Sequence, residues 1–401
     1  MSTERLYYTD AYRTSFDARV LRCAPRPPSG GAPAFGVELD STAFYPTSGG
    51  QPFDVGTLDE VRVIDVLDEE DGRITHVTEA PLAEGAAVSG TVDWARRFDH
   101  MQQHTGQHVL SAAFDRLFAN RTESFHLGSD TCTIDLARDA AASDVAVAVD
   151  EANRIVWEDR PVEVRFVTAE EAATLPLRKE PARGGMLRLI EVKEFDLSAC
   201  GGTHVARTGG IGIIAVSGWE KFRGGARVHF LCGARTLRRF GLWRDALSAT
   251  QRHLSVAPEE LAPAVERLQG DNKSLQRALR TAQEKLAVHE ATVLVARGER
   301  VGGRLVVVEA VPDLDAGALK AMAAAAAGEP GAAVVLFGAA TPALVVVAAH
   351  PGAGIDANAT LKGLVARFGG KGGGKPELAQ GGGLVGSSAD LVAAARALVT
   401  A

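Results

Sequence analysis

The chain has 401 residues, of which 46% are hydrophobic and 23% charged, and its formal net charge is −7 at pH 7. This composition is ordinary for a globular protein and leaves room for roughly two to four domains. No apolar run approaches the ~20 residues that span a bilayer, and no apolar signal core follows the first residues, so neither a membrane span nor a leader is expected. Four scattered cysteines are too few for a disulfide framework, which predicts reduced thiols and a cytoplasmic location.

Residues 1–90 are predicted to be rich in β-strands. Residues 34–39 and 61–66 are short runs with apolar and β-branched side chains, which are typical of strands. The dipeptide Asp71-Gly72 follows the second run and is a hairpin-turn signal. We therefore expect a β-rich, barrel-like domain over residues 1–90.

The segment 94–120 is predicted to be a helix, because large apolar residues recur on one of its faces. The members of this stripe are Leu110, Phe114, Leu117 and Phe118. Residues 143–149 predict a further helix, and the segments 162–167, 211–216 and 227–231 predict strands. Because helices and strands mix in this way, we expect an α+β domain over residues 91–233.

Two doublets of potential metal ligands lie within this second domain. His104 and His108 are four residues apart and therefore project from one face of the predicted helix. Cys200 and His204 flank Gly201-Gly202, where a flexible backbone can turn both side chains inward. Three imidazoles and a thiolate suit Zn²⁺ better than Mg²⁺ or Ca²⁺. No Glu directly follows His104, so the general base of HExxH metalloproteases is missing. A closed four-ligand site is usually structural and an open one catalytic, and the sequence leaves both possibilities open.

The tripeptide Gly49-Gly50-Gln51 has two interpretations. Glycines allow a substrate to lie against bare backbone amides, which can polarise a carbonyl as an oxyanion hole does. The alternative is a simple hairpin turn. His100, one helical turn before His104, is expected to pack or to hydrogen-bond beside the ligands.

Residues 234–300 are predicted to form a helical linker or coiled coil. Pro258 suits the first turn of a helix, and beyond it apolar residues alternate three and four apart. This heptad seam consists of Leu261, Val265, Leu268, Asn272, Leu275, Leu279, Ala282 and Leu286. Asn272 is of the type that fixes the register of a coiled coil. Two arrangements fit the seam: an antiparallel hairpin with helix 234–254, or a homodimer.

Residues 301–401 are predicted to form a small α/β domain. The runs 305–308, 333–337 and 344–348 are continuously apolar, which is typical of strands buried on both faces. The glycine tract Gly369–Gly383 is too long for turns alone, which favours a surface of backbone amides for phosphates. Residues 369–375 fit GxxxxGK, but Pro376 stands where a phosphate loop needs Ser or Thr, so nucleotide hydrolysis is not expected.

Basic residues gather in two segments despite the negative total charge. Residues 219–244 contain seven basic residues and one acid, a local net charge of +6, and residues 362–377 have a net charge of +3. Local basic surface decides phosphate contact, so these segments predict an RNA surface. The proposed tRNA contacts are Arg223, Arg227, Lys371 and Lys375. The alternative is that these are solvated cations on a helix face.

Four segments resemble one family, in that family's order. Residues 97–110 look like the HxxxH helix of the alanyl-tRNA synthetase editing domain, and residues 198–205 resemble its CxxxH loop. Residues 42–52 are similar to the glycine-rich substrate loop of that family, and residues 372–383 to its C-terminal domain. The resemblance runs almost end to end, and it is closest to the long form of alanyl-tRNA editing proteins.

The resemblance implies a zinc-dependent hydrolase that removes serine, and also glycine, from mischarged tRNA(Ala). It implies that the zinc ligands are His104, His108, Cys200 and His204. It places Thr42, Gly50 and Gln51 in the substrate pocket, with Thr42 as the partner of the serine hydroxyl. Editing without charging is expected, because the segments of an aminoacylation domain have no room before residue 1.

Two other functions stay open at this point. One is a catalytically silent tRNA-binding protein with a structural zinc. The other is editing of Ser-tRNA(Thr) by a related domain that shares both zinc doublets. Residues 234–401 argue against the second, because the glycine-rich C-terminal match belongs to the alanine system.

Overall fold

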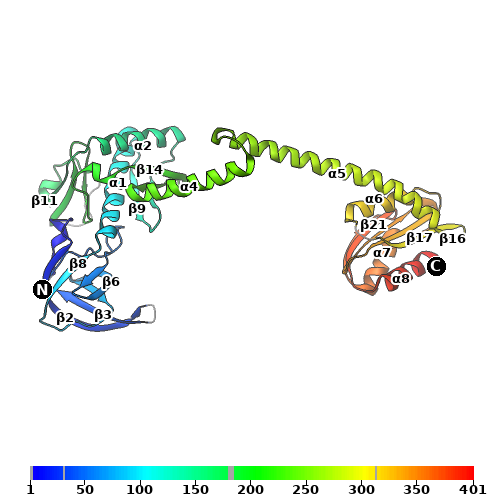
Figure 1. Ribbon diagram of the computed structural model, residues 1–401, viewed down its shortest axis with the longest axis horizontal. Helices are drawn as coiled ribbons and strands as arrows, with labels where there is room; N and C mark the ends of the chain where they lie inside the picture. The colour runs from blue at the N-terminus through cyan, green and yellow to red at the C-terminus, as the bar shows by residue number, and fades with distance from the viewer. Residues whose placement is uncertain (1–2, 30–31, 179–184, 312–313) are drawn as a thin grey trace. The chain divides into compact units, whose positions relative to one another are not determined.

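The computed structural model describes residues 3–29, 32–178, 185–311 and 314–401. The chain divides into two compact units, Met1–Ala249 and Thr250–Ala401, each with its own hydrophobic core (Figure 1). Both units contain helices and strands, so the predicted mixed α+β class is confirmed. Among the described residues, no helix is long and apolar enough to cross a membrane.

Six strands near the start of the first unit close into a barrel, as the pattern of residues 1–90 predicts. In order around the barrel they are β2 (Ser15–Ser29), β3 (Ala32–Leu39), β7 (Ile74–Thr78), β6 (Val61–Asp68), β5 (Gly56–Leu58) and β8 (Ala87–Val92). Buried and exposed residues alternate along β8, so every second side chain faces the interior. Asp71 and Gly72 lie in the turn between β6 and β7, and Gly72 has a φ of 85°, which favours glycine.

Helix α1 (Trp94–Phe118) runs through the core of the first unit. It begins where the Asp93 side chain accepts a hydrogen bond from the Arg96 amide, and Ala119 ends it in the left-handed conformation. Every residue from 100 to 114 is buried, polar ones included, whereas Leu117 of the predicted stripe is exposed. Buried polar side chains need hydrogen-bond partners. The polar residues of α1 must therefore find these partners on the elements packed around the helix.

Two antiparallel sheets complete the first unit, together with helix α2 (Ala142–Trp157), which packs against α1. The first sheet has the order β14 (Ile214–Phe222), β15 (Gly225–Cys232), β10 (Cys132–Leu136) and β9 (Thr122–Leu127). The second has the order β11 (Val162–Thr168), β12 (Met186–Val192) and β13 (Asp196–Ala199), and the short helix α3 (Ala169–Ala172) follows β11. Strand β14 begins later than the predicted 211–216, because Thr208–Ile211 forms a 3₁₀ turn.

A pair of two-residue strands joins the start of the chain to the loop beyond the barrel strand β3. Strand β1 (Glu4–Arg5) pairs in parallel with β4 (Ser41–Thr42), and the register places Arg5 opposite Thr42. The 3₁₀ turn Leu6–Tyr8 follows β1 directly. This pairing fixes the backbone on which the segment 42–52 begins.

Two long helices follow β15, as residues 234–297 predict. They are α4 (Gly233–Leu254) and α5 (Leu261–Arg297), and Pro258 begins the 3₁₀ turn that precedes α5. Four leucines of the predicted seam are each more than half exposed: Leu268, Leu275, Leu279 and Leu286. A helix with such an uncovered apolar seam is consistent with either predicted partner, and the coiled coil and the homodimer stay predictions.

The second unit is built on one six-stranded sheet with helices on both faces. The strand order is β16 (Glu299–Val301), β17 (Arg304–Val311), β18 (Ala332–Gly338), β19 (Ala343–Ala349), β21 (Leu378–Leu384) and β20 (Lys371–Gly374). Helices α5 and α6 (Ala316–Ala326) share one core with it, and α7 (Ala357–Phe368) and α8 (Ser388–Thr400) share the other. All seven residues of β18 are buried, which explains its continuous apolar run.

The glycine tract forms the hairpin of β20 and β21 at the edge of this sheet. A Cβ atom on Gly372 would lie 2.5 Å from the Gly381 Cα, so the two strands approach too closely for side chains there. Helix α7, and not a strand, directly precedes the tract. A phosphate loop needs a strand in that position, so the tract does not have the structural context of a phosphate loop.

Candidate metal centre and active site

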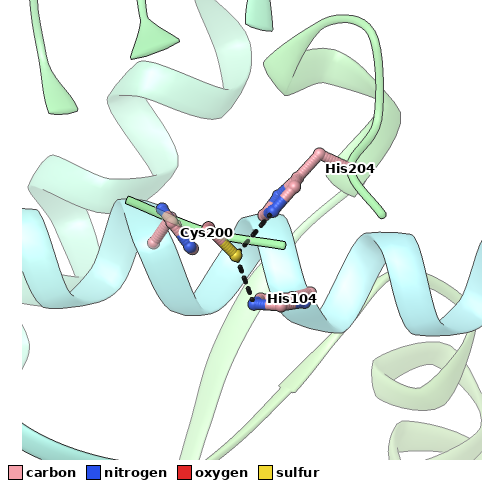
Figure 2. A group of neighbouring side chains, drawn as sticks. His104, Cys200 and His204 are labelled. Carbon is pink, nitrogen blue, oxygen red and sulfur yellow. Dashed lines mark hydrogen bonds between the residues drawn. The ribbon is translucent and has the colours of Figure 1, made fainter. Parts of the chain in front are cut away.

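The four predicted ligands come together in the first unit. Helix α1 provides His104 and His108, and the loop after β13 provides Cys200 and His204. One ligand atom of each residue lies within 4.8 Å of those of the others. Figure 2 shows the Cys200 sulfur between His104 and His204, with Sγ 3.4 Å from the Nε2 atoms of both. The two doublets therefore form one cluster.

The geometry of this cluster suits a tetrahedral Zn²⁺. With Zn–N near 2.1 Å and Zn–S near 2.3 Å, the N···S edge of a tetrahedron is about 3.6 Å. The two N···S separations of 3.4 Å around Cys200 are close to that value. Imidazole nitrogen and thiolate sulfur are also the donors that Zn²⁺ accepts most readily. The cluster can therefore hold a metal ion.

Each histidine of the cluster is held at its Nδ1 atom by a different neighbour. The pairs are His104 with Gln51 Oε1 at 2.8 Å, His108 with Asp196 Oδ2 at 2.9 Å, and His204 with Thr105 Oγ1 at 3.2 Å. A proton on Nδ1 that is donated to such an oxygen leaves Nε2 unprotonated and free to bind a metal. The arrangement therefore orients all three imidazoles for coordination.

The pKa shifts of Cys200 and His204 favour the protonation states that bind a metal cation. Burial acts to raise the pKa of the Cys200 thiol, but His104 and His204 hold it well below its usual range. The Gly202 amide donates to the Cys200 sulfur at 3.4 Å, which further stabilises a thiolate. Burial lowers the pKa of His204 to about 3, so that its imidazole is neutral.

His108 differs: burial acts to lower the pKa of its imidazole, but Asp196 and Cys200 raise that pKa above its usual value. Metal binding requires the thiolate and neutral imidazoles, so it would displace a proton from His108 wherever that residue is charged.

Asp196 is a functional residue that the sequence reasoning missed. Its carboxylate accepts hydrogen bonds from His108 Nδ1 at 2.9 Å, from Arg178 Nε at 2.6 Å and from Ser198 Oγ at 3.1 Å. Burial acts to raise the pKa of its carboxyl, but Arg178 and His108 keep that pKa far below its usual value. The only signal in the sequence was an acid four residues before Cys200.

Arg188 is a second missed residue, and it braces the ligand loop. Its buried guanidinium donates to the carbonyl oxygen of Cys200 at 2.7 Å and to that of Gly202 at 2.9 Å. Its Nε donates to the Tyr8 carbonyl at 3.0 Å, which ties the loop to the 3₁₀ turn near the N-terminus. A charged residue among the apolar side chains of β12 was the signal that could have identified it.

The loop of Gly50 and Gln51 lies directly against the cluster. Gln51 Oε1 accepts hydrogen bonds from His104 Nδ1 at 2.8 Å and from the Thr203 amide at 3.1 Å, and Gln51 is fully buried. Gly50 has a φ of 86°, and a Cβ there would lie 2.9 Å from the Phe125 carbonyl oxygen. Gln51 thus orients His104, and Gly50 lets the loop pack closely against β9. The substrate contacts predicted for both residues stay predictions.

Thr42 is fully buried, and its hydroxyl already has two partners. The oxygen lies 2.7 Å from His76 Nε2 and accepts from the Phe44 amide at 3.0 Å. His76 Nδ1 lies 3.0 Å from the Val37 carbonyl oxygen, which can only accept, so Nε2 is the acceptor of the Thr42 proton. One lone pair of the Thr42 oxygen is left, but Thr42 is not among the residues that line the cavity beside the cluster. Its role in serine recognition stays a prediction.

A small cavity of about 140 Å³ opens beside the cluster. Its walls include His104, His108 and Cys200 on the metal side and Gly49 from the glycine loop. The other polar residues that line it are Gln107, Thr122, Glu123, Ser124, Arg178 and Ser198. A pocket lined by hydroxyls, an amide and charged groups suits a small polar acyl group.

The two arginines predicted to bind tRNA, Arg223 and Arg227, have different surroundings in the structure. Arg227 is paired with Asp135, which faces it across β10 and β15, with N···O distances of 2.7 and 2.9 Å. Arg223 is exposed in the hairpin between β14 and β15, and its guanidinium lies 5.0 Å from the Phe222 ring centroid. Lys371 and Lys375 are exposed in the second unit. Contact of these residues with RNA stays a prediction.

Two family models match the chain. Residues 302–401 match the DHHA1 domain. Residues 187–228 match the model described as the threonyl and alanyl tRNA synthetase second additional domain. The second match contains Cys200 and His204 together with Arg188 and Asp196, so it covers the ligand loop and the residues that brace it.

The chain is also similar to curated proteins of two kinds. It is 33% identical over 316 residues to an alanine–tRNA ligase of Pyrococcus furiosus, covering 75% of this chain and 33% of that one. It is 31% identical over 397 residues to that of Pyrococcus abyssi, covering 94% and 42%. The chain thus spans only about a third to two fifths of these ligases. It is 32% identical over 295 residues to the alanyl-tRNA editing protein Aarsd1 of Mus musculus, covering 70% of this chain and 71% of that one. On this last match, the chain belongs to the family of alanyl-tRNA editing proteins.

Proposed function

We propose that this protein is a trans-editing hydrolase that deacylates mischarged tRNA(Ala), chiefly Ser-tRNA(Ala) and also Gly-tRNA(Ala). The observation that carries the proposal is the cluster itself, in which His104, His108 and His204 each have Nδ1 engaged while Nε2 faces the Cys200 side. The small polar cavity beside it supports a site for an aminoacyl ester. The named activity of the editing relatives gives the substrate class.

The chemistry proposed for the site divides between the metal and the chain. When bound, Zn²⁺ would position the substrate and water, and it would polarise the ester as a Lewis acid with one of its four protein ligands displaced. His104, His108, Cys200 and His204 hold it, as proposed from their donor chemistry. Gly49 borders the cavity with its backbone, which suits the close approach of a carbonyl. The polar lining of the cavity orients the acyl group against this centre.

The proposed preference for serine has a physical basis. A pocket that hydrogen-bonds the serine hydroxyl would leave its own polar group unpaired against alanine, and such a site can reject the analogue by ~10⁴-fold or more. Thr42 is the proposed partner, through the lone pair that His76 and Phe44 leave unused. The glycyl group of Gly-tRNA(Ala) would enter the pocket because it is small, and it would make no hydrogen bond to Thr42.

The RNA body is proposed to lie against basic residues of both units. Arg223 is the clearest contact in the first unit, because it is exposed next to the aromatic Phe222. Lys371 and Lys375 are the proposed contacts in the second. Arg227 would meet a phosphate only by sharing its guanidinium with Asp135.

Two rival functions give different outcomes in one experiment. A silent tRNA-binding protein with structural zinc would bind tRNA(Ala) but hydrolyse nothing. An editor of Ser-tRNA(Thr) would hydrolyse serine from tRNA(Thr) in preference to tRNA(Ala). The relatives named for alanine argue against the second rival.

The test is deacylation of Ser-tRNA(Ala), Gly-tRNA(Ala), Ala-tRNA(Ala) and Ser-tRNA(Thr) by the purified chain. We expect the fastest hydrolysis with Ser-tRNA(Ala) and little with correctly charged Ala-tRNA(Ala). The Cys200→Ala variant serves as the inactive control, because it removes one metal ligand. No hydrolysis of any of these substrates by the metal-loaded protein would overturn the proposal.

A further inference from the structure

A second cavity, of about 350 Å³, lies in the first unit next to the start of α1. Its walls come from two helices, α1 and α4, and from two loops, the turn between β9 and β10 and the glycine loop at Pro52. The charged and titratable residues that line it are Arg96, Asp99 and His100 of α1 and Arg235 and Arg238 of α4. Three guanidinium groups thus face one carboxylate. The cavity has an excess of positive charge and suits an anion.

Two of these arginines have hydrogen-bonding capacity to spare. Arg235 does not, since it pairs with Asp99 at 2.7 Å and donates to the Gly128 carbonyl at 2.6 Å. Arg96 donates only its Nε, to the Phe53 carbonyl, and has no carboxylate partner among the described residues. Arg238 is largely exposed, and its closest carboxylate oxygen, on Asp99, is 3.9 Å away. Arg96 and Arg238 therefore offer their terminal donors to the cavity.

His100 lines the same cavity and carries a buried polar atom without a partner among the described residues. The residue is 3% exposed, and its Nδ1 is buried without a hydrogen-bond partner in the described part of the chain. Burial, with the charge of Arg96 adding to it, lowers the pKa of His100 to about 3, so the imidazole is neutral. A buried polar group without a partner is rare in native proteins and needs an explanation. His100 was expected to pack or to hydrogen-bond, and no described residue supplies a hydrogen bond to its Nδ1.

This cavity and the metal centre are neighbours. His100 and His104 lie one turn apart on α1, a rise of about 6 Å along the helix. Gly49 lines the metal cavity and Pro52 lines the second one, so the glycine loop passes between them. Strand β9 likewise contributes Phe125 to the first cavity, while the turn that follows β9 contributes to the second.

We infer that the second cavity binds a phosphate group of the RNA close to its aminoacylated end, through Arg96 and Arg238. The inference rests on the proposed function, because it takes the ester at the metal centre as its reference point. The aminoacyl ester and the phosphate that links the terminal nucleotide to the preceding one are attached to the same ribose, so only one sugar separates them. A phosphate held beside the metal centre would therefore set the position of the ester. Arginine suits this role because its planar fork of donors matches phosphate oxygens.

The test couples a change in the protein to a change in the RNA. Affinity of the full chain for uncharged tRNA(Ala) is measured at several salt concentrations, for the wild type and for an Arg96→Gln/Arg238→Gln double variant. The same RNA is also made with a neutral methylphosphonate at each of the last three linkages in turn. The matched control is Arg165→Gln, which removes a positive charge from an exposed position on β11 outside both cavities.

The expected result is a reduction of at least about 10-fold in affinity for the double variant, as for hydrogen bonds to charged groups. The slope of log affinity against log salt should fall by about 0.7, because the double variant neutralises one phosphate fewer. One neutral linkage should weaken the wild type and the Arg165→Gln control but leave the double variant unaffected. If each neutral linkage weakens the wild type and the double variant by the same factor, the effects on affinity are additive and the inference is overturned.

A separate arm distinguishes RNA from free phosphate. Inorganic phosphate is titrated into the wild type and the double variant and followed by calorimetry. If phosphate binds only to the wild type while the RNA effects are additive, the cavity is a site for the free anion and the RNA assignment is wrong. Because binding is the readout, the loss of the linkage effect in the double variant can be observed even if the chain hydrolyses no ester. The failure of this inference can therefore be distinguished from the failure of the proposed function.

Discussion

The Nδ1 atom of His108 lies 2.9 Å from Oδ2 of Asp196, across 88 residues of sequence. This contact joins α1, which carries two ligands, to the strand that leads into the ligand loop. Arg178 holds the other carboxylate oxygen of Asp196 at 2.6 Å. A carboxylate behind a ligating histidine fixes the orientation of its ring and raises its basicity, so the pair connects the fold of the domain to its affinity for metal.

Replacing Asp196 with Asn should weaken Zn²⁺ binding by about 10- to 100-fold. The amide oxygen can still accept from His108, but the negative charge is removed and Arg178 no longer has its ionic partner. Competition with a chromophoric chelator measures the affinity. The matched control is Asp139→Asn, which neutralises an exposed carboxylate paired with Lys221. An unchanged affinity in Asp196→Asn would show that this contact is not part of the metal site.

The adjacent glycines of the ligand loop should respond oppositely to alanine. A Cβ on Gly202 would lie 2.2 Å from the His104 ring, whereas the nearest atom to a Cβ on Gly201 is 3.7 Å away. Gly202→Ala should therefore displace His104 and remove most zinc and activity, and Gly201→Ala should keep both. Zinc content and deacylation rate are measured for each. Equal behaviour of the two variants would contradict this account of the loop.

Thr42→Val tests selectivity. The substitution keeps the branched shape and removes the hydroxyl, so the rate on Ser-tRNA(Ala) should fall while that on Gly-tRNA(Ala) is largely spared. One neutral hydrogen bond is worth about 0.5–1.5 kcal/mol, or roughly a 2- to 13-fold change in the ratio of the two rates. An equal reduction on both substrates would mean that Thr42 serves only its contacts with His76 and Phe44.

The stability of the protein should depend on pH through His76. Burial lowers the pKa of His76 to about 4 in the folded state, against about 6.5 when unfolded. Between these values the unfolded chain binds more protons, so this group lowers the free energy of unfolding as pH falls from about 6.5 to about 4, by up to about 3 kcal/mol. Urea denaturation of the wild type and His76→Gln across this range measures the difference. A pH dependence that is the same in both proteins would contradict the assignment.

The sequence predicted each doublet of the metal cluster from short-range rules, whereas the meeting of the two doublets, 96 residues apart, was predicted from their donor chemistry and from the family resemblance. The spacing of four residues on a helix places His104 and His108 together, and two glycines let Cys200 and His204 turn toward one point. The closed barrel and the doubly covered sheet of the second unit likewise follow from local patterns of apolar residues.

The supporting contacts could not be predicted, because they join distant residues through packing. Gln51 reaches Thr203 across 152 positions, and only the folded chain brings them together. Arg227 has a basic sequence neighbourhood, but the register of β10 and β15 sets it opposite Asp135. Charge counted along the sequence cannot distinguish such a paired arginine from an exposed one such as Arg223.

The most direct test of the central claim measures metal content and deacylation on the same preparation. The account predicts about one zinc per chain in the wild type, with hydrolysis of Ser-tRNA(Ala) that disappears on chelation and returns with added Zn²⁺. It also predicts that Cys200→Ala and His104→Ala lose zinc and activity together. Full hydrolysis of Ser-tRNA(Ala) by a wild-type protein that contains no metal would contradict it.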